Sequence, residues 1–210
     1  SRKSTIILLL ILAGVVVLSV WYAKSQPQYA NIDSPRPIKG DPKSSIVLEE
    51  FSDFQCPACG AAQPVVQEVL KTYGDKIAFH YRHFPLLSIH ANAFSAALAA
   101  ECANDQGKFW EYHDLLFKNQ KDLRQATLLR LADETDLNKD FFAACLKSRA
   151  KARVVQADMQ EGERRKINST PTFYLNGELV ENWQRLPELI GVEVGRLGNA
   201  ATTTNTTNNQ

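Results

Sequence analysis

Residues 54–60 read FQCPACG and hold two cysteines, Cys56 and Cys59, in a C-x-x-C spacing. The apolar run before them, SIVLEEF at residues 45–51, is typical of a strand buried in the middle of a sheet. The run after them, residues 57–73, has the apolar spacing of a helix. The pair therefore lies where a buried strand passes into a helix, and sulfurs at positions i and i+3 face each other across the first helical turn.

The two cysteines have different expected roles. Cys56 lies at or before the helix start, where free N–H groups and the helix dipole stabilise a thiolate and lower the pKa of the thiol. Because the thiolate is the reactive form, Cys56 is expected to be the attacking sulfur, and Cys59, one turn deeper, the resolving thiol. Pro57 fits the first helical position, which needs no N–H partner, and Ala58 completes the redox dipeptide.

Two alternatives compete with redox chemistry at this pair. A zinc site would need two more ligands at comparable spacing, and Cys102 and Cys145 are isolated in the sequence, so no metal is expected. A purely structural disulfide would constrain the unfolded chain little, because the loop that it closes is so short. Redox chemistry is therefore the favoured use of Cys56 and Cys59.

The rest of the chain predicts an α/β domain with a helical insertion. A second strand is expected at residues 76–84, and Asn176-Gly177 is a hairpin signal between two short strands. Between them lies a helical stretch, at about residues 86–166, that is far longer than one crossover between strands requires. The expected helices lie at residues 91–103, 108–119, 125–135, 138–147 and 149–165, the last strands at 172–175 and 178–180, and a closing helix at 186–197.

The two ends of the chain are expected to lie outside this domain, which covers residues 45–198. Residues 4–23 carry no charge and would reach roughly 30 Å as a helix, so residues 1–24 predict one transmembrane anchor. A removed signal peptide is the alternative, and the flanking charges do not decide the orientation. The proline-rich residues 25–44 predict an extended linker, and the Thr/Asn-rich residues 199–210 a disordered tail.

The composition of the 210-residue chain limits its class. Hydrophobic residues make up 44% and charged residues 22%, which excludes a wholly disordered, collagen-like or coiled-coil chain. The formal net charge is +1, so no strong overall field would recruit nucleic acid, and no nucleic-acid partner is expected. The function must therefore come from specific side chains.

Four motifs, in order along the chain, resemble those of the DsbA-like thiol:disulfide oxidoreductases of the thioredoxin superfamily. They are EFSDFQCPAC at residues 50–59, HFPL at 83–86, GKFWEYH at 107–113 and TPTF at 170–173, and the resemblance covers residues 45–197. It implies a thioredoxin fold with a helical insertion and no metal or organic cofactor. It also implies that Cys56 is the nucleophile, that Cys59 resolves the mixed disulfide, and that Pro171 is cis and faces Cys56.

Thr170 and Pro171 are the expected substrate-binding residues. Pro171 stands at the start of a strand, where its missing N–H does not interrupt the ladder. If its peptide bond is cis, the chain turns sharply and leaves the backbone groups of Thr170 open to an extended polypeptide.

The same resemblance singles out Glu50, because members of the superfamily often carry a buried acid six residues before the first cysteine. Strand alternation places Glu50 on one face with Ile46 and Leu48. A carboxyl group buried there would have a raised pKa and could relay a proton for Cys59, whereas the alternative is a solvated strand end. Strong oxidants of the family carry a histidine where this chain has Ala58, which argues against extreme oxidising strength.

Cys102 and Cys145 both fall in the helical insertion, away from any helix start, and are expected to form a structural disulfide. The bridge would close a loop of about 44 residues and contribute about 4 kcal/mol, and two buried free thiols are the alternative. Such a disulfide requires an oxidising compartment. Together with the resemblance, this places the expected domain outside the cytoplasmic membrane and the amino terminus inside.

The chain is therefore expected to be a monomeric, membrane-anchored, extracytoplasmic dithiol oxidase. It would introduce disulfides into cysteine-containing secreted or membrane proteins through Cys56 and Cys59. The resemblance implies that a quinone-linked membrane partner of the DsbB or VKOR type reoxidises it. The alternatives are a reductase or isomerase with the same site, and an anchored module that binds extended peptides beside Pro171.

Overall fold

The computed structural model describes residues 11–21 and 35–206. The chain divides into two compact units, Ser1–Asn31 and Ile32–Gln210, and each is described here by itself.

The described part of the first unit is a helix at residues 11–21 with exposed side chains. Among the residues that the structure describes, no helix is both long and apolar enough to cross a bilayer. This helix covers only part of the expected anchor. The rest of the anchor and the first half of the expected linker fall on residues 1–10 and 22–34, which lie outside the described residues.

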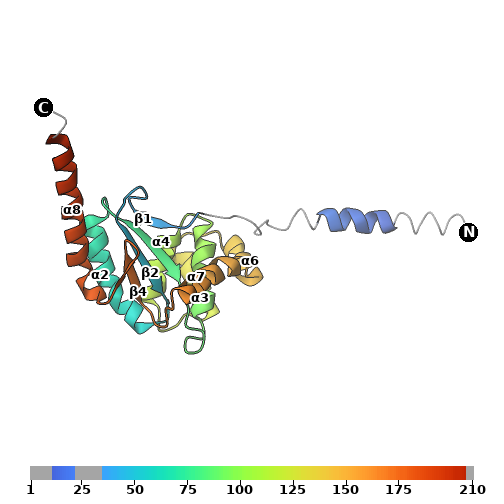
Figure 1. The fold of residues 1–210 in the computed structure, drawn as a ribbon. Helices are drawn as coiled ribbons and strands as arrows, with labels where there is room; N and C mark the ends of the chain where they lie inside the picture. Colours follow the sequence, from blue (N-terminus) through green and yellow to red (C-terminus); the bar gives the residue numbers. More distant parts are fainter. Residues whose placement is uncertain (1–10, 22–34, 207–210) are drawn as a thin grey trace, which may run out of the picture. The chain divides into compact units, whose positions relative to one another are not determined.

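The second unit is built on a five-stranded sheet with the strand order β1-β3-β2-β4-β5 (Figure 1). β2 and β3 pair in parallel, and the other neighbours pair antiparallel. The strands are β1 (Ile38–Gly40), β2 (Val47–Ser52), β3 (Ala78–His83), β4 (Thr172–Leu175) and β5 (Glu178–Val180). All but β1 are predicted by the sequence.

β1 corrects the expected boundary between linker and domain. It pairs antiparallel with β3, with Ile38 opposite His80. Just before it, the Arg36 guanidinium forms an ion pair with the Asp158 carboxylate, with 2.6 Å between nitrogen and oxygen. The end of the expected linker is therefore part of the domain. The sequence does not reveal this because a three-residue edge strand is too short to show a hydrophobic period.

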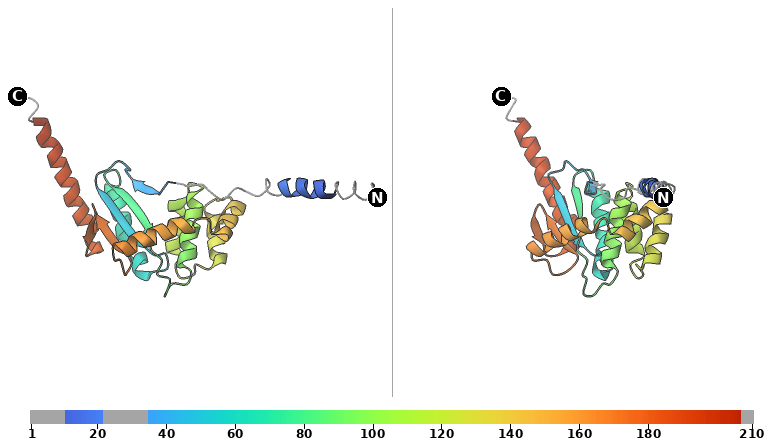
Figure 2. Two further views of the ribbon diagram at one scale, coloured as in Figure 1. Left: turned by 45° about the vertical axis from the view of Figure 1, so that its right-hand side comes forward. Right: turned by 90° about the vertical axis from the view of Figure 1, so that its right-hand side faces the viewer.

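Helices cover both sides of the sheet. They are α2 (Pro57–Tyr73), α3 (Ala93–Asn104), α4 (Phe109–Lys118), α5 (Gln125–Glu134), α6 (Lys139–Ser148), α7 (Ala152–Arg164) and α8 (Leu186–Thr206), with a short 3-10 helix, η1, at Trp183–Arg185. Figures 1 and 2 show α2 and α8 packed side by side against the sheet. α4 lies on the same face, with Trp110 against Phe79, whereas α7 covers the opposite face, where Gly162 packs against Phe51. The α/β fold with a helical insertion is therefore confirmed.

Two apolar cores adjoin the same face of the sheet, because Phe79 and Tyr81, two residues apart on β3, project from one face. One lies between the strands and helices α2 and α8, and it includes Val66, Phe79 and Ile190. The other fills the helical insertion and reaches the sheet through Phe54 and Tyr81, whose rings stack with 5.2 Å between their centroids. Since Phe54 comes two residues before the first cysteine, the C-x-x-C segment lies where the two cores meet.

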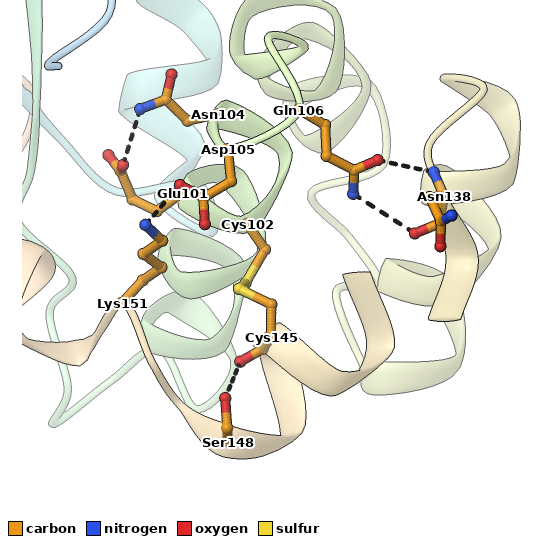
Figure 3. Close-up of a disulfide and its surroundings, with 9 residues drawn as sticks. All are labelled: Glu101, Cys102, Asn104, Asp105, Gln106, Asn138, Cys145, Ser148 and Lys151. Carbon is orange, nitrogen blue, oxygen red and sulfur yellow. Dashed lines mark hydrogen bonds and ion pairs between the residues drawn. A yellow bond between two sulfur atoms is a disulfide. The ribbon is translucent and has the colours of Figure 1, made fainter. Parts of the chain in front are cut away.

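A disulfide joins Cys102 in α3 to Cys145 in α6 inside the insertion (Figure 3). The pairing that the sequence favoured over two free thiols is therefore present, and both cysteines are buried. Nearby, the Gln106 side chain accepts a hydrogen bond from the N–H of Asn138 at 2.7 Å (Figure 3). Asn138 in turn caps α6 by accepting the N–H of Phe141.

The hairpin between β4 and β5 forms as predicted. Asn176 and Gly177 have φ values of 53° and 85°, and a type I′ turn requires positive φ at both positions. The Asn176 backbone and side chain also bond both backbone groups of Val47, which ties the hairpin to β2.

α8 begins at Leu186 as predicted but continues to Thr206. The expected end at Leu197 is therefore wrong, because the two glycines near that point do not stop the helix and no proline follows them. The tail that was expected to be disordered from residue 199 is helical up to Thr206, and the remainder lies outside the described residues.

Candidate active site

Cys56 is the N-cap residue of α2, at the end of the loop that follows β2. Its backbone is extended, with φ −72° and ψ 119°, and Pro57 occupies the first turn as predicted. The Cys56 sulfur lies 3.3 Å from the carbonyl oxygen of Thr170, to which the thiol donates a hydrogen bond when it is protonated. The Thr170–Pro171 peptide bond is cis. The first cysteine and the cis-proline segment, 114 residues apart in the chain, therefore meet as the resemblance implied.

Cys59 lies one turn further along α2 and is fully buried, with 0% of its surface exposed against 7% for Cys56. The Cys59 sulfur accepts a hydrogen bond from the backbone N–H of Asp53 at 3.4 Å. Both thiols are free. A partner thiol arriving from solvent can reach only the Cys56 sulfur, so the geometry separates an attacking from a resolving position.

Hydrogen bonding lowers the pKa of the Cys56 thiol, whereas burial raises the pKa of the Cys59 thiol. A hydrogen bond from the Cys59 thiol is the largest cause that lowers the pKa of Cys56 to about 5, and burial works against it. Thr170 and the backbone N–H groups of Ala58 and Cys59 lower the Cys56 pKa further. Burial raises the pKa of Cys59 far above its usual range, and Cys56 and the Glu50 carboxyl raise it more. Cys56 is therefore a thiolate at neutral pH while Cys59 keeps its proton.

Glu50 is fully buried at the end of β2 that leads to the redox pair. Burial raises its pKa to about 7, although Ser52 and Gln63 lower it. The Gln63 amide lies 3.5 Å from one carboxylate oxygen. The alternative of a solvated strand end is therefore wrong. A carboxyl group with this pKa exchanges protons at neutral pH, as a proton relay requires.

Asp53 connects the loop after β3 to the redox segment through hydrogen bonds, a role that the sequence does not predict. Its carboxylate accepts hydrogen bonds from the N–H of Leu86 at 2.8 Å, from the N–H of Gln55 at 2.7 Å and from Nδ1 of His90 at 2.7 Å. The Gln55 bond is an Asx-turn, a local pattern that the sequence does contain. No local sequence pattern predicts the contacts with Leu86 and His90, because they join distant parts of the chain.

Gln120, just beyond α4, is a second residue that the sequence gave no reason to select. Its side-chain amide donates to the carbonyl oxygens of Phe54, at 3.3 Å, and of Cys56, at 3.0 Å. Gly60 makes room for it, because a Cβ atom there would overlap the Gln120 amide. The insertion therefore holds the redox loop directly. Gln120 and Cys56 are 64 residues apart in the sequence, so no local sequence pattern predicts their contact.

The remaining residues singled out from the sequence fall outside this cluster or add little to it. Ala58 contributes only its backbone, so no side chain at this position bonds the Cys56 thiolate. The Cys102–Cys145 disulfide lies within the insertion. Among the described residues, no three His, Cys, Asp or Glu side chains converge as a metal site would need.

A family model described as thioredoxin matches residues 33–191 of the chain. Among solved structures, the chain is similar to oxidised BdbD from Bacillus subtilis, with a TM-score of 0.66 and 24% identity over 80% of this chain and 94% of that one. It is also similar to a thioredoxin-like oxidoreductase from Silicibacter pomeroyi, with a TM-score of 0.68 and 25% identity over 79% of this chain and 99% of that one. MdbA, a thiol-disulfide oxidoreductase from Corynebacterium diphtheriae, gives a TM-score of 0.60 at 20% identity over 77% and 98%.

The curated relatives are longer proteins with other names. The chain is 41% identical over 140 residues to the Na(+)/H(+) antiporter NhaA 3 of Salinispora tropica, a match that covers 67% of this chain and 21% of the antiporter. It is 37% identical over 162 residues to the Na(+)/H(+) antiporter NhaA 1 of a Mycobacterium species, covering 76% and 26%. The chain therefore spans about a fifth to a quarter of the length of these relatives.

Proposed function

Because this chain belongs to the thioredoxin family and has a DsbA-like fold, we propose that it is a thiol:disulfide oxidoreductase that introduces disulfides into other proteins. The observation that carries the proposal is the position of Cys56. Its sulfur lies at the start of α2, against the carbonyl oxygen of Thr170 in the cis-proline segment, with a pKa lowered to about 5. A stable Cys56 thiolate is a good leaving group, which favours the direction that leaves the enzyme reduced.

The proposed reaction starts from the Cys56–Cys59 disulfide. A substrate thiolate attacks the Cys56 sulfur, the bond between Cys56 and Cys59 breaks, and Cys59 leaves as a thiolate and takes up a proton. A second substrate thiolate then attacks the substrate sulfur of the mixed disulfide, and Cys56 leaves as a thiolate. The substrate loses two electrons and gains a disulfide, and the enzyme pair is reduced.

The same site supports a reductase or isomerase if the reduction potential is low. The side chain of Ala58 makes no hydrogen bond to the Cys56 thiolate, which argues for a milder oxidant and supports this alternative. The likeness to proteins named Na(+)/H(+) antiporters favours a second candidate role, a redox module that works beside a membrane transporter. An anchored peptide-binding module remains the alternative without redox chemistry.

The cell compartment and the partners belong to the same proposal. The Cys102–Cys145 disulfide supports a domain outside the cytoplasmic membrane, because intracellular thiols are kept reduced. We propose that the chain is anchored by its amino-terminal segment and acts as a monomer on cysteine-containing proteins. A quinone-linked membrane protein of the DsbB or VKOR type would reoxidise it.

The reduction potential of the Cys56–Cys59 pair, measured in the full chain against glutathione, tests the direction of the reaction. A value of about −120 to −180 mV is expected for an oxidase, whereas a value near about −270 mV would indicate a reductant of the thioredoxin kind. The Cys56→Ser variant is the control and should lose all oxidation of a reduced, unfolded substrate protein. Retained activity in that variant would contradict any redox role.

A further inference from the structure

Three buried polar atoms beside the redox pair have no hydrogen-bond partner among the described residues. They are the second carboxylate oxygen of Glu50, the hydroxyl oxygen of Ser52 and the hydroxyl oxygen of Tyr81. All three residues are at most 3% exposed. Buried polar atoms nearly always have a hydrogen-bond partner, so three atoms without one in the same place require an explanation.

The sheet brings these atoms together. Glu50 and Ser52 are two residues apart on β2 and therefore project from the same face. Tyr81 stands directly opposite Glu50 in the parallel pairing of β2 with β3. Cys59 comes to the same place from α2, because its sulfur accepts the N–H of Asp53, the residue after Ser52. The buried thiol and the three unpaired polar atoms thus lie together in one buried polar cluster.

The Ser52 hydroxyl lies next to the other members of this cluster. It shares a face of β2 with Glu50, and its influence lowers the pKa of Glu50, of Cys59 and of Tyr81, although it makes no hydrogen bond of ordinary length to any of them. A hydroxyl group can donate one hydrogen bond while it accepts another. Neither the Glu50 carboxylate nor the Cys59 thiolate, which only accept, can bridge the gap between them alone.

We propose that the Ser52 hydroxyl relays the proton between the Cys59 sulfur and the Glu50 carboxyl group, with Tyr81 orienting the Ser52 hydroxyl. The inference rests on the proposed redox function. When Cys59 leaves as a thiolate, the Ser52 hydroxyl proton passes to the Cys59 sulfur while the Glu50 carboxyl proton passes to the Ser52 oxygen. Cys59 ends as a thiol and Glu50 as a carboxylate, and no electrons move in this step. The reverse transfer activates Cys59 when it resolves a mixed disulfide.

Gln63 lies between this buried polar cluster and a cleft at the surface. Its amide touches Glu50, and its side chain lines a cleft of about 270 Å³ between α2 and α4. Asp114 and Lys118 line the same cleft from α4. Glu50 can therefore recover its proton past Gln63, through the cleft between α2 and α4. The titrating groups that face Glu50 are Cys59 from α2 and Tyr81 from β3, with Asp53 nearby in the loop.

The test measures how fast Cys59 resolves a mixed disulfide in the full chain. Glutathione is attached to Cys56, and its release is followed by stopped flow from pH 5 to pH 9. In the wild type the rate should rise as Glu50 ionises near pH 7. Ser52→Ala should slow release at least about tenfold and remove that rise, since it deletes the relay but no hydrogen bond within the fold.

Two further variants separate a relay from a structural role. Ser52→Thr keeps a hydroxyl and should retain the wild-type pH profile. Glu50→Gln should be as slow as Ser52→Ala, and the double variant no slower than either, because groups that act in one relay do not add. The double variant decides the matter if Thr does not fit the buried site.

The experiment distinguishes a failure of the Ser52 relay from a failure of the proposed redox function. If the wild type forms the mixed disulfide and releases glutathione but Ser52→Ala matches it at every pH, or if the effects of Ser52→Ala and Glu50→Gln add, the relay is overturned and the redox function stands. If the wild type forms no mixed disulfide at Cys56, the redox function itself is overturned, and the relay falls with it.

Discussion

At the scale of single residues, two sulfurs three positions apart experience opposite environments. The Cys56 sulfur lies at the N-terminal end of α2, where backbone N–H groups and the Cys59 thiol stabilise negative charge. The Cys59 sulfur lies inside the protein, where burial disfavours charge. One helical turn thus separates a reactive thiolate from a thiol that burial keeps protonated.

The alkylation of the two thiols should show this difference. In the reduced full chain, iodoacetamide should modify Cys56 with a half-maximal rate at a pH of about 5, while Cys59 stays unmodified until the chain unfolds. Mass mapping of alkylated peptides measures both. In the Cys59→Ala variant, the pKa of Cys56 should rise, because the strongest stabilising hydrogen bond is lost. An unchanged Cys56 pKa in that variant would show that the Cys59 thiol does not stabilise the thiolate.

Glu50 should make the stability of the protein depend on pH. Its pKa is about 7 in the folded chain against 4.5 when exposed, so its contribution to stability is complete below pH 4.5 and is lost as the pH rises to 7. Because glutamine does not ionise, the Glu50→Gln variant does not lose stability over this pH range. The variant should gain stability over the wild type across that window, by roughly 3 kcal/mol at most, and the gain should level off above pH 7. Urea unfolding at several pH values measures it, and a constant difference would contradict the raised pKa.

At the scale of elements, the start of α2 is held by the insertion through Gln120. The two amide hydrogens of Gln120 reach the carbonyl oxygens of Phe54 and Cys56, and Gly60 leaves space for the contact. The helix that carries the redox pair is therefore positioned from outside the β-α-β unit that contains it.

Gly60→Ala tests this contact. In the wild type the added methyl group should displace Gln120 and destabilise the protein by about 1–3 kcal/mol. In the Gln120→Ala background the same change should stabilise it by about 0.5–1 kcal/mol, because alanine is the better helix former. Thermal unfolding of the four proteins measures the cycle, and the same sign in both backgrounds would refute the contact.

The disulfide of the insertion should act on stability alone. Replacing Cys102 and Cys145 together by alanine should lower the free energy of unfolding by about 4 kcal/mol, because the bridge closes a long loop of the unfolded chain. The Cys56 pKa should stay unchanged, since the bridge lies within the insertion. A combined denaturation and alkylation experiment gives both values, and a shifted Cys56 pKa would show coupling between the two cysteine pairs.

At the scale of the whole domain, the redox pair lies between two cores, so its oxidation state should change global stability. The pKa of Cys56 is lowered on folding, so the stability that its thiolate contributes is present at high pH and is lost as the pH falls through about 5. The reduced chain should therefore unfold at a higher temperature than the oxidised chain at pH 7. Calorimetry at pH 7 and pH 4 should show this difference shrink, and an oxidised chain that is more stable at pH 7 would contradict the oxidase direction.

The parts of the fold that the sequence predicts are those with local causes. The strand before Cys56, the proline at the start of α2 and the Asn176-Gly177 turn each follow from the chemistry of a few neighbouring residues. The missed parts depend on tertiary contacts. β1 is an edge strand that its partner defines, and Gln120 and Ser52 have roles only because the fold brings them to the redox pair.

The edge position of β1 determines how the domain would respond to mechanical load. Tension along the chain ahead of Arg36 would reach the domain first at the Arg36–Asp158 ion pair and then at the pairing of β1 with β3. Because β1 has a partner on one side only, such a pull would peel it away one hydrogen bond at a time. β3 stands between β1 and β2, the strand that leads to Cys56. Such tension would thus detach β1 from β3 before the force reached β2 and the Cys56–Cys59 segment.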